Sequence, residues 1–188
     1  MTLARTVTAM AVTAMVAASC ADVSVYRYRN VYTMVAPAVS SDKAFSDDVM
    51  DISFFLDEKK VRFTALNKSS ESVTLDWGKA SFVNFDGVKH SVSSSRYVFT
   101  SGKEDPEPMV INPGVTVTDF VAPVKNVEKL EEWTWYVYPL FNLKDDGALA
   151  NKGKTIGLDV PVKAKGEWRT YSFRFEVSHV APADQLMK

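Results

Sequence analysis

Residues 61–87, VRFTALNKSSESVTLDWGKASFVNFDG, decide the class of fold. Apolar and polar residues alternate in two runs, whose apolar members are Val61, Phe63 and Ala65, then Val73, Leu75 and Trp77. Such alternation is typical of half-buried β-strands, because successive side chains point to opposite faces. The polar residues 67–72 between the runs supply turn chemistry. We therefore predict the central hairpin of an all-β domain, with Trp77 packed in its core.

The segment before this stretch and its own last residues predict further turns. Residues 49–56 are mainly apolar, and the polar residues 57–60 separate them from Val61, which indicates a second hairpin. Asp86 and Gly87 lie between apolar residues. This pair favours a tight two-residue turn, because glycine tolerates a positive φ.

The last third of the chain alternates most regularly. Residues 156–162 and 171–177 carry an apolar side chain at every second position, and Gly166 lies in the turn between them. Pro161 cannot donate a ladder hydrogen bond, so it predicts an edge strand or a bulge. No segment shows a convincing helical period, and we count roughly nine or ten short strands. The spacing predicts one antiparallel all-β domain, a sandwich or a barrel.

The first twenty residues predict a secretion signal. Arg5 is the only charged residue before Asp22, and residues 6–18 consist of Val, Ala, Met and Thr. This apolar run is too short to span a bilayer but suits a signal peptide. It ends in Ala17-Ala18-Ser19, the small residues that a signal peptidase accepts.

Cys20 follows these small residues directly and is the only cysteine, so no intrachain disulfide can form. The arrangement resembles the lipobox of bacterial lipoproteins, in which the cysteine is lipidated and becomes the first mature residue. Ala17 departs from the larger aliphatic residue usual there. Ordinary secretion, with cleavage near Ser19 or Ala21, is the alternative. Ala21 in place of Asp after the cysteine favours the outer membrane under the enterobacterial sorting rule.

These signals predict the organisation of the chain. The expected parts are a signal peptide at 1–19, a lipidated N-terminus and tether with a candidate first strand at 20–46, the β-sandwich domain at 47–180 and a C-terminal tail at 181–188.

Composition and spacing exclude several classes of function. The net charge of -1 gives no electrostatic attraction to nucleic acid. His90 and His179 are the only histidines, too few for a zinc site without further cysteines, so we expect both at the edge of the core and no cofactor. Residues 147–155 resemble a phosphate-binding loop, but five residues separate the glycines and a predicted strand follows.

One aromatic segment is a candidate binding surface. Trp133, Trp135, Tyr136 and Tyr138 place aromatic side chains on both faces of one predicted strand. One face must pack inward, and the other is free to stack on a sugar ring or a partner protein. The alternative is a strand buried on both sides, since aromatic residues dominate protein cores.

Several motifs carry a family resemblance. They are Leu66-Asn67-Lys68-Ser69, Val73-Thr74-Leu75-Asp76-Trp77, Asp86-Gly87, Ile111-Asn112-Pro113-Gly114 and Tyr171-Ser172-Phe173-Arg174-Phe175. Together they resemble a group of uncharacterised bacterial lipoproteins with an immunoglobulin-like β-sandwich. The resemblance covers most of the chain from about residue 49 and implies that fold and a place in the cell envelope. It implies no activity.

The sequence therefore predicts a non-enzymatic envelope lipoprotein, anchored to the membrane through Cys20, that binds an envelope protein or acts as a structural accessory. The alternative is a carbohydrate- or ligand-binding module that uses the aromatics from Trp133 to Tyr138. An envelope hydrolase is less favoured, because no nucleophile, base and orienting group assemble in the sequence.

Overall fold

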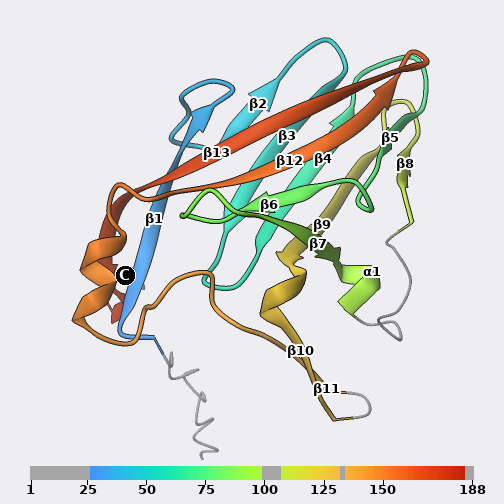
Figure 1. Ribbon diagram of the computed structural model, residues 1–188. Helices are drawn as coiled ribbons and strands as arrows, with labels where there is room; N and C mark the ends of the chain where they lie inside the picture. Colours follow the sequence, from blue (N-terminus) through green and yellow to red (C-terminus); the bar gives the residue numbers. More distant parts are fainter. Residues whose placement is uncertain (1–25, 99–106, 132–133, 185–188) are drawn as a thin grey trace, which may run out of the picture.

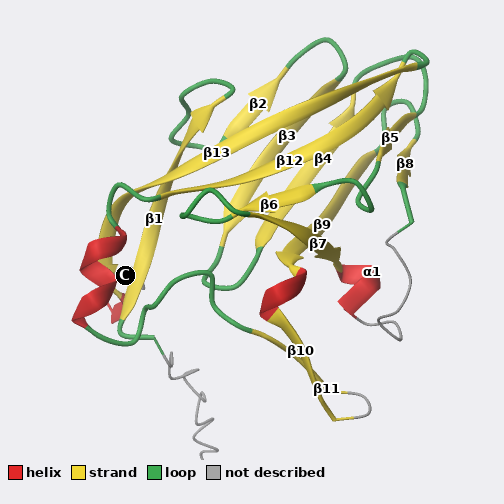
Figure 2. Ribbon diagram, in the orientation of Figure 1, coloured by secondary structure: helices red, strands yellow, loops and turns green. Residues whose placement is uncertain are grey.

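The computed structural model describes residues 26–98, 107–131 and 134–184, and it is almost entirely β-structure (Figure 1). Helical segments are short, the longest being the six-residue η2 (Figure 2). The elements are β1 (Tyr28–Ala36), β2 (Ala44–Ser46), β3 (Met50–Leu56), β4 (Val61–Asn67), β5 (Val73–Leu75), β6 (Ser81–Val83), β7 (Lys89–Ser94), α1 (Ser95–Val98), β8 (Met109–Ile111), β9 (Thr116–Pro123), η1 (Val124–Asn126), β10 (Val127–Glu131), β11 (Thr134–Val137), η2 (Asp146–Asn151), β12 (Thr155–Ala164) and β13 (Glu167–Pro182). The all-β prediction is confirmed, although the strands are more numerous than the nine or ten expected, and β12 and β13 are long.

Nine strands form one antiparallel, nearly closed sheet in the order β1-β13-β12-β6-β7-β9-β4-β3-β2. The sheet folds over so that β12 and β13 face β3 and β4 (Figure 1). β7 belongs to both layers: Lys89–Ser91 pairs with β6, whereas Val92–Ser94 pairs with β9. β5 and β8 extend the layer of β12, and β10 and β11 form a separate pair.

The core fills the space between the two layers. Phe54 on β3 lies 4.6 Å, ring centroid to centroid, from Phe173 on β13 and 5.1 Å from Phe175. Trp77 is buried and its ring centroid lies 5.2 Å from that of Phe63, so its predicted place in the core is confirmed. Alternating apolar residues on facing strands thus meet in one cluster, which is what period-two patterning requires.

Three predicted hairpins are present. β3 pairs with β4, and β12 pairs with β13 through a two-residue turn in which Lys165 and Gly166 both have positive φ. The turn between β6 and β7 is longer than predicted. Asn84 N–H donates to the Val88 carbonyl at 3.0 Å, so three residues form the loop. The Asn84 side chain accepts from the N–H groups of Asp86 in the loop and of Val88 directly after it, and so stabilises the longer form.

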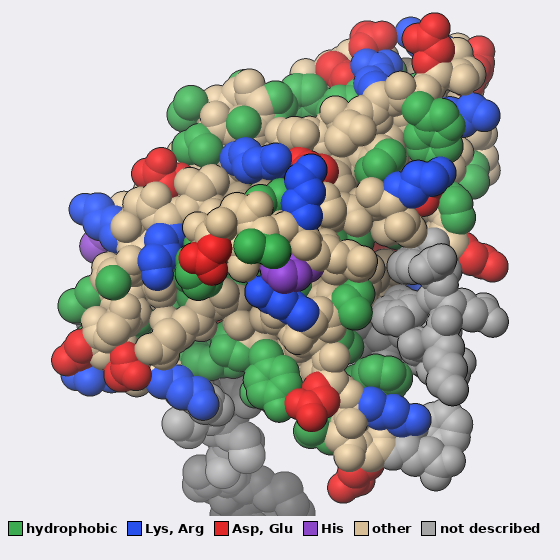
Figure 3. All heavy atoms as spheres, in the orientation of Figure 1, with side chains coloured by type: hydrophobic (Ala, Val, Ile, Leu, Met, Phe, Trp, Pro, Cys, Tyr) green, Lys and Arg blue, Asp and Glu red, His purple; other side chains and the backbone are tan. Residues whose placement is uncertain are grey.

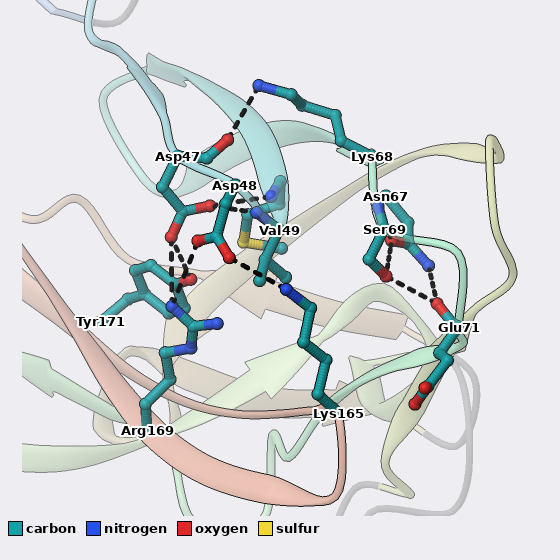
Figure 4. Close-up of polar contacts among 11 residues, drawn as sticks. Asp47, Asp48, Val49, Asn67, Lys68, Ser69, Glu71, Lys165, Arg169 and Tyr171 are labelled. Atoms are coloured by element: carbon teal, nitrogen blue, oxygen red, sulfur yellow. Dashed lines mark hydrogen bonds and ion pairs between the residues drawn. The ribbon is translucent and has the colours of Figure 1, made fainter.

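The predicted hairpin between residues 61–67 and 73–77 is wrong. β4 pairs with β3 and β9, whereas β5 pairs with β12 and β8, so the intervening loop crosses from one layer to the other. Asn67 holds this crossover (Figure 4). Its fully buried amide donates to the carbonyls of Glu71 (2.7 Å) and Ile111 (2.8 Å) and accepts from Ser69 N and Oγ. A polar side chain therefore supplies the bonds that a hairpin ladder would otherwise make.

The expectation that Pro161 marks an edge or a bulge is also wrong. β12 is paired on both sides: β13 covers one edge, and β6 and β5 share the other. β6 pairs with Gly157–Asp159 and β5 with Val162 and Lys163, so Pro161 falls in the gap between them. The missing N–H therefore removes no ladder bond.

The sheet takes in residues that precede the predicted domain start at 47. β1 pairs with β13 from Tyr28↔Pro182 to Ala36↔Arg174. Part of the segment assigned to the tether is therefore an integral strand.

Candidate functional site

β10 and β11 form a two-stranded hairpin that projects from the lower end of the sheet (Figure 1). It carries three of the aromatic residues singled out from the sequence. Trp135 and Tyr136 are half-buried, and Tyr138 is 44% exposed. Trp133 and Cys20 lie outside the described residues. Apolar side chains are visible at this end in the space-filling view, among charges of both signs like those over the rest of that face (Figure 3).

The two faces of the hairpin differ. Directly opposed residues share a face, and the register pairs Tyr136 with Glu128 but Trp135 with Lys129. Tyr136 faces the body of the protein, where the Lys59 ammonium lies 4.3 Å from its ring centroid. Trp135 lies on the opposite face. The alternative of a strand buried on both sides is wrong, because no residue of β11 is buried: Thr134 is exposed, and Trp135, Tyr136 and Val137 are half-buried.

The base of the hairpin is fixed by hydrogen bonds. Tyr138 N–H donates to the Asn126 carbonyl at 2.7 Å, and the Asn126 side chain donates to the carbonyls of Tyr138 and Pro139. Burial together with a hydrogen bond to Tyr136 raises the pKa of Tyr26 to about 12. The first described residue of the chain therefore lies against the base of this hairpin.

A cleft of about 430 Å³ lies beside the hairpin base, between β1 and the end of β3. Its wall includes Arg29, Asn30, Tyr32, Lys43, Leu56 and Leu143. Charges at its mouth are largely paired. Arg29 Nε lies 3.2 Å from a Glu58 oxygen and Arg62 Nε 3.3 Å from an Asp57 oxygen. Sequence reasoning missed this cleft because its lining comes from four separate segments, each of which reads as an ordinary strand or turn.

The histidines do not form a site. His90 is half-buried on β7, and burial, together with the positive charge of Lys125, lowers its pKa. His179 is exposed, contrary to expectation. Val31 pairs with His179 and Tyr32 with Val177, so Ser178 forms a bulge that reverses the alternation. Among the described residues, no group of three or more His, Cys, Asp or Glu side chains could hold a metal ion.

The loop that resembles a phosphate-binding motif has a different structure. Asp146–Asn151 forms the short 3₁₀ helix η2, and the chain then enters strand β12 at Thr155. No helix follows the glycines, so the helix N-terminus that would bind phosphate is missing from this part of the structure.

A polar cluster at the opposite end is structural. The Asp47 carboxylate accepts from the Tyr171 hydroxyl at 2.5 Å and from Arg169 at 3.4 Å, while Asp48 pairs with Lys165 (Figure 4). Burial and the hydrogen bond to Asp47 raise the pKa of Tyr171. Each carboxylate has a cationic partner, and these contacts join the β2–β3 loop to β13 and the turn before it.

A further ion-pair cluster, centred on the buried Asp159, lies on the outer face of β12. Asp159 accepts from Arg174 at 2.7 Å and pairs with Lys89 at 2.9 Å. A Cβ on Gly157 would stand 2.7 Å from Arg174 Cδ, so only glycine lets the arginine lie across the strand. Burial alone would raise the pKa of Asp159, but hydrogen bonds from Arg174, Lys89 and Ser172 outweigh it and lower the pKa to about 2.

This pair makes stability depend on pH. A carboxylate whose pKa is lowered by folding stabilises the folded state above its unfolded pKa, and that stabilisation is lost as the pH falls towards the folded value. We expect a loss of roughly 2 kcal/mol between about pH 4 and pH 2 that depends on Asp159. Urea unfolding across this range should show a flatter pH dependence for Asp159→Asn. Asp86→Asn, which changes an exposed turn carboxylate, should keep the steep dependence. Equal slopes in all three proteins would contradict the assignment.

No helix in the described part of the chain is long and apolar enough to cross a membrane. No protein-family model, no curated protein and no solved structure matches this chain.

Proposed function

We propose that this protein is a lipid-anchored, non-enzymatic binding protein of the bacterial envelope, held on the outer membrane through Cys20, with the β10–β11 hairpin as its contact element. The proposal includes the immunoglobulin-like family that the sequence motifs resemble. Two facing antiparallel layers with interlocked aromatic side chains support that classification.

The observation that carries the proposal is the position of the aromatic hairpin. Tyr26 lies against Tyr136 at the hairpin base. Six residue steps separate Tyr26 from Cys20, which corresponds to at most about 20 Å of extended chain. A lipid on Cys20 would therefore hold this end of the domain close to the bilayer surface.

The hairpin has the chemistry of an interfacial element. Leu130 is 52% exposed and Tyr138 44%, and Trp135 is half-buried on the face turned away from the domain. Trp and Tyr favour the headgroup region, because their rings are apolar while their N–H or O–H groups keep a polar partner. The Tyr138 hydroxyl already has such a partner in Glu128.

The experiment combines membrane fractionation with tryptophan fluorescence. Cys20→Ala should move the protein from the membrane to the soluble fraction. The purified Cys20→Ala protein should still show a blue shift of tryptophan emission with phosphatidylethanolamine vesicles, and Trp135→Ala should abolish that shift. Trp168 supplies the matched control, because it is 50% exposed but lies near the β12–β13 turn at the far end of the sheet.

Two results would count against the proposal. If the Cys20→Ala protein stays with the membrane, the proposal of a lipid anchor on Cys20 is contradicted. If the emission shift is lost in Trp168→Ala but kept in Trp135→Ala, the hairpin is not the element that contacts the membrane.

A carbohydrate-binding module is the second candidate, favoured by the partly exposed Trp135 ring. Envelope oligosaccharides, rather than vesicles, would then shift the emission of the Cys20→Ala protein, because sugar rings stack on the faces of aromatic side chains.

A further inference from the structure

The nearly closed sheet has one open seam. β1 and β2 are the two ends of the strand order, and β2 covers β3 only at Asp51–Ser53. Below that point, β1 and the end of β3 face each other across the cleft of about 430 Å³. No strand pairing joins β1 to β3 in the described residues.

The seam edge of β1 has free backbone groups. Tyr28 N–H donates to the Leu143 carbonyl at 3.1 Å and Met34 N–H to the Ser40 carbonyl at 3.0 Å, so both point away from β13. Backbone groups of a strand alternate in direction, so those of Asn30 and Tyr32 point the same way, into the cleft. Neither residue is paired on that side among the described residues.

The facing edge of β3 also has unpaired backbone groups, over a shorter length. Phe54 N–H donates to the Lys43 carbonyl at 3.0 Å, away from β4. Leu56 is the next residue in phase, and its backbone groups face the cleft. Seven successive antiparallel pairings separate β1 from β3, so these two strands run in opposite directions.

The side chains of the cleft also match a peptide. Asn30 Oδ1 is buried without a hydrogen-bond partner, whereas Arg29 Nε lies 3.2 Å from a Glu58 oxygen. An unpaired buried acceptor suits a peptide group, which offers an N–H. Leu56 and Tyr32 supply an apolar wall.

The charge at the mouth of the cleft indicates which side chains the peptide carries. Arg29 and Arg62 are already paired with Glu58 and Asp57. Among the residues that the structure describes, the Lys43 ammonium contacts only the Ser41 carbonyl, at 2.9 Å. The unneutralised cation favours an acidic side chain on the outward face of the ligand.

From these observations we infer that the seam binds an extended segment of a partner protein, with alternating apolar and acidic side chains, as an added strand antiparallel to β1. Adding a strand to a free sheet edge gives affinity through the main chain and specificity through alternate side chains. The cleft volume is that of sites which hold small ligands or a few residues. This inference concerns a different surface from the hairpin and does not depend on a lipid anchor.

The test uses the Cys20→Ala full chain and the end-blocked peptide Val-Glu-Val-Glu-Val. Saturating peptide should slow hydrogen exchange of the Asn30, Tyr32 and Leu56 amides at least about tenfold. Lys43→Glu should weaken binding by about tenfold. Lys163→Glu, an exposed lysine on β12, should leave the affinity unchanged.

A backbone-modified peptide separates strand addition from binding by side chains alone. The same peptide, N-methylated at every second amide, cannot donate to one of its two neighbours and should not bind. Equal affinity of the methylated peptide would overturn the inference. So would protection of the three amides in the free protein, because the chain itself or a second copy would then fill the seam.

Discussion

Phe54→Ala should lower the free energy of unfolding by about 3–5 kcal/mol, the largest effect that we expect of a single core substitution. Phe54 is 5% exposed and its ring contacts those of Phe173 and Phe175 on the facing layer. Truncation would remove both interlayer contacts and leave a cavity. β3 could not move inward to fill it without breaking its pairing with β4. Urea unfolding followed by Trp77 fluorescence measures the loss.

Phe55→Ala is the matched control. The two phenylalanines are adjacent on β3, but Phe55 is 61% exposed on the outer face. Its truncation should change the free energy of unfolding by no more than about 0.5 kcal/mol. Phe54→Leu keeps most of the buried volume and should cost about 1–1.5 kcal/mol, which extends the test if Phe54→Ala does not fold. Equal losses for Phe54→Ala and Phe55→Ala would contradict the alternation of faces on β3.

Asn67→Ala should destabilise the protein by about 2–4 kcal/mol. The substitution would leave the Ile111 and Glu71 carbonyls and the Ser69 N–H without the partners that the buried amide supplies. Asn67→Asp has nearly the same shape but cannot donate when ionised. It should therefore be strongly destabilised at pH 7 and recover part of its stability as the pH falls, because burial raises the pKa of the new carboxyl.

Asn112→Ala controls for the removal of an asparagine from the same region. Asn112 is exposed, and its side chain accepts one hydrogen bond, from Ser72 Oγ at 3.0 Å. Its loss should cost no more than about 0.5 kcal/mol in the same urea experiment. A cost for Asn67→Ala as small as that for Asn112→Ala would show that the crossover does not depend on the buried amide.

Local pattern predicts the strands well but not their partners. The alternation around Phe63 and Leu75 identifies two strands and their inward faces correctly. Both patterns remain the same whether β4 and β5 pair with each other or with different layers, because alternation records only which side is buried. The distinguishing signal is Asn67, whose polar character at a position in phase with buried Phe63 and Ala65 indicates a satisfied internal amide.

In the candidate site, too, the sequence predicts the local elements but not their arrangement. A strand at Thr134–Val137 follows from its β-branched and aromatic residues, but its projection from the domain depends on which strands remain without a partner. The exposure of His179 depends on the bulge at Ser178 in β13, and nothing in the local sequence predicts that bulge. The cleft requires the ends of the strand order to be known, and that order is a property of the whole chain.

The shared strand β7 has a mechanical consequence. Since its two halves belong to different layers, the layers cannot slide past one another without stretching the same backbone ladder. We therefore expect the width of the seam between β1 and β2 to change only together with the curvature of the sheet at β7.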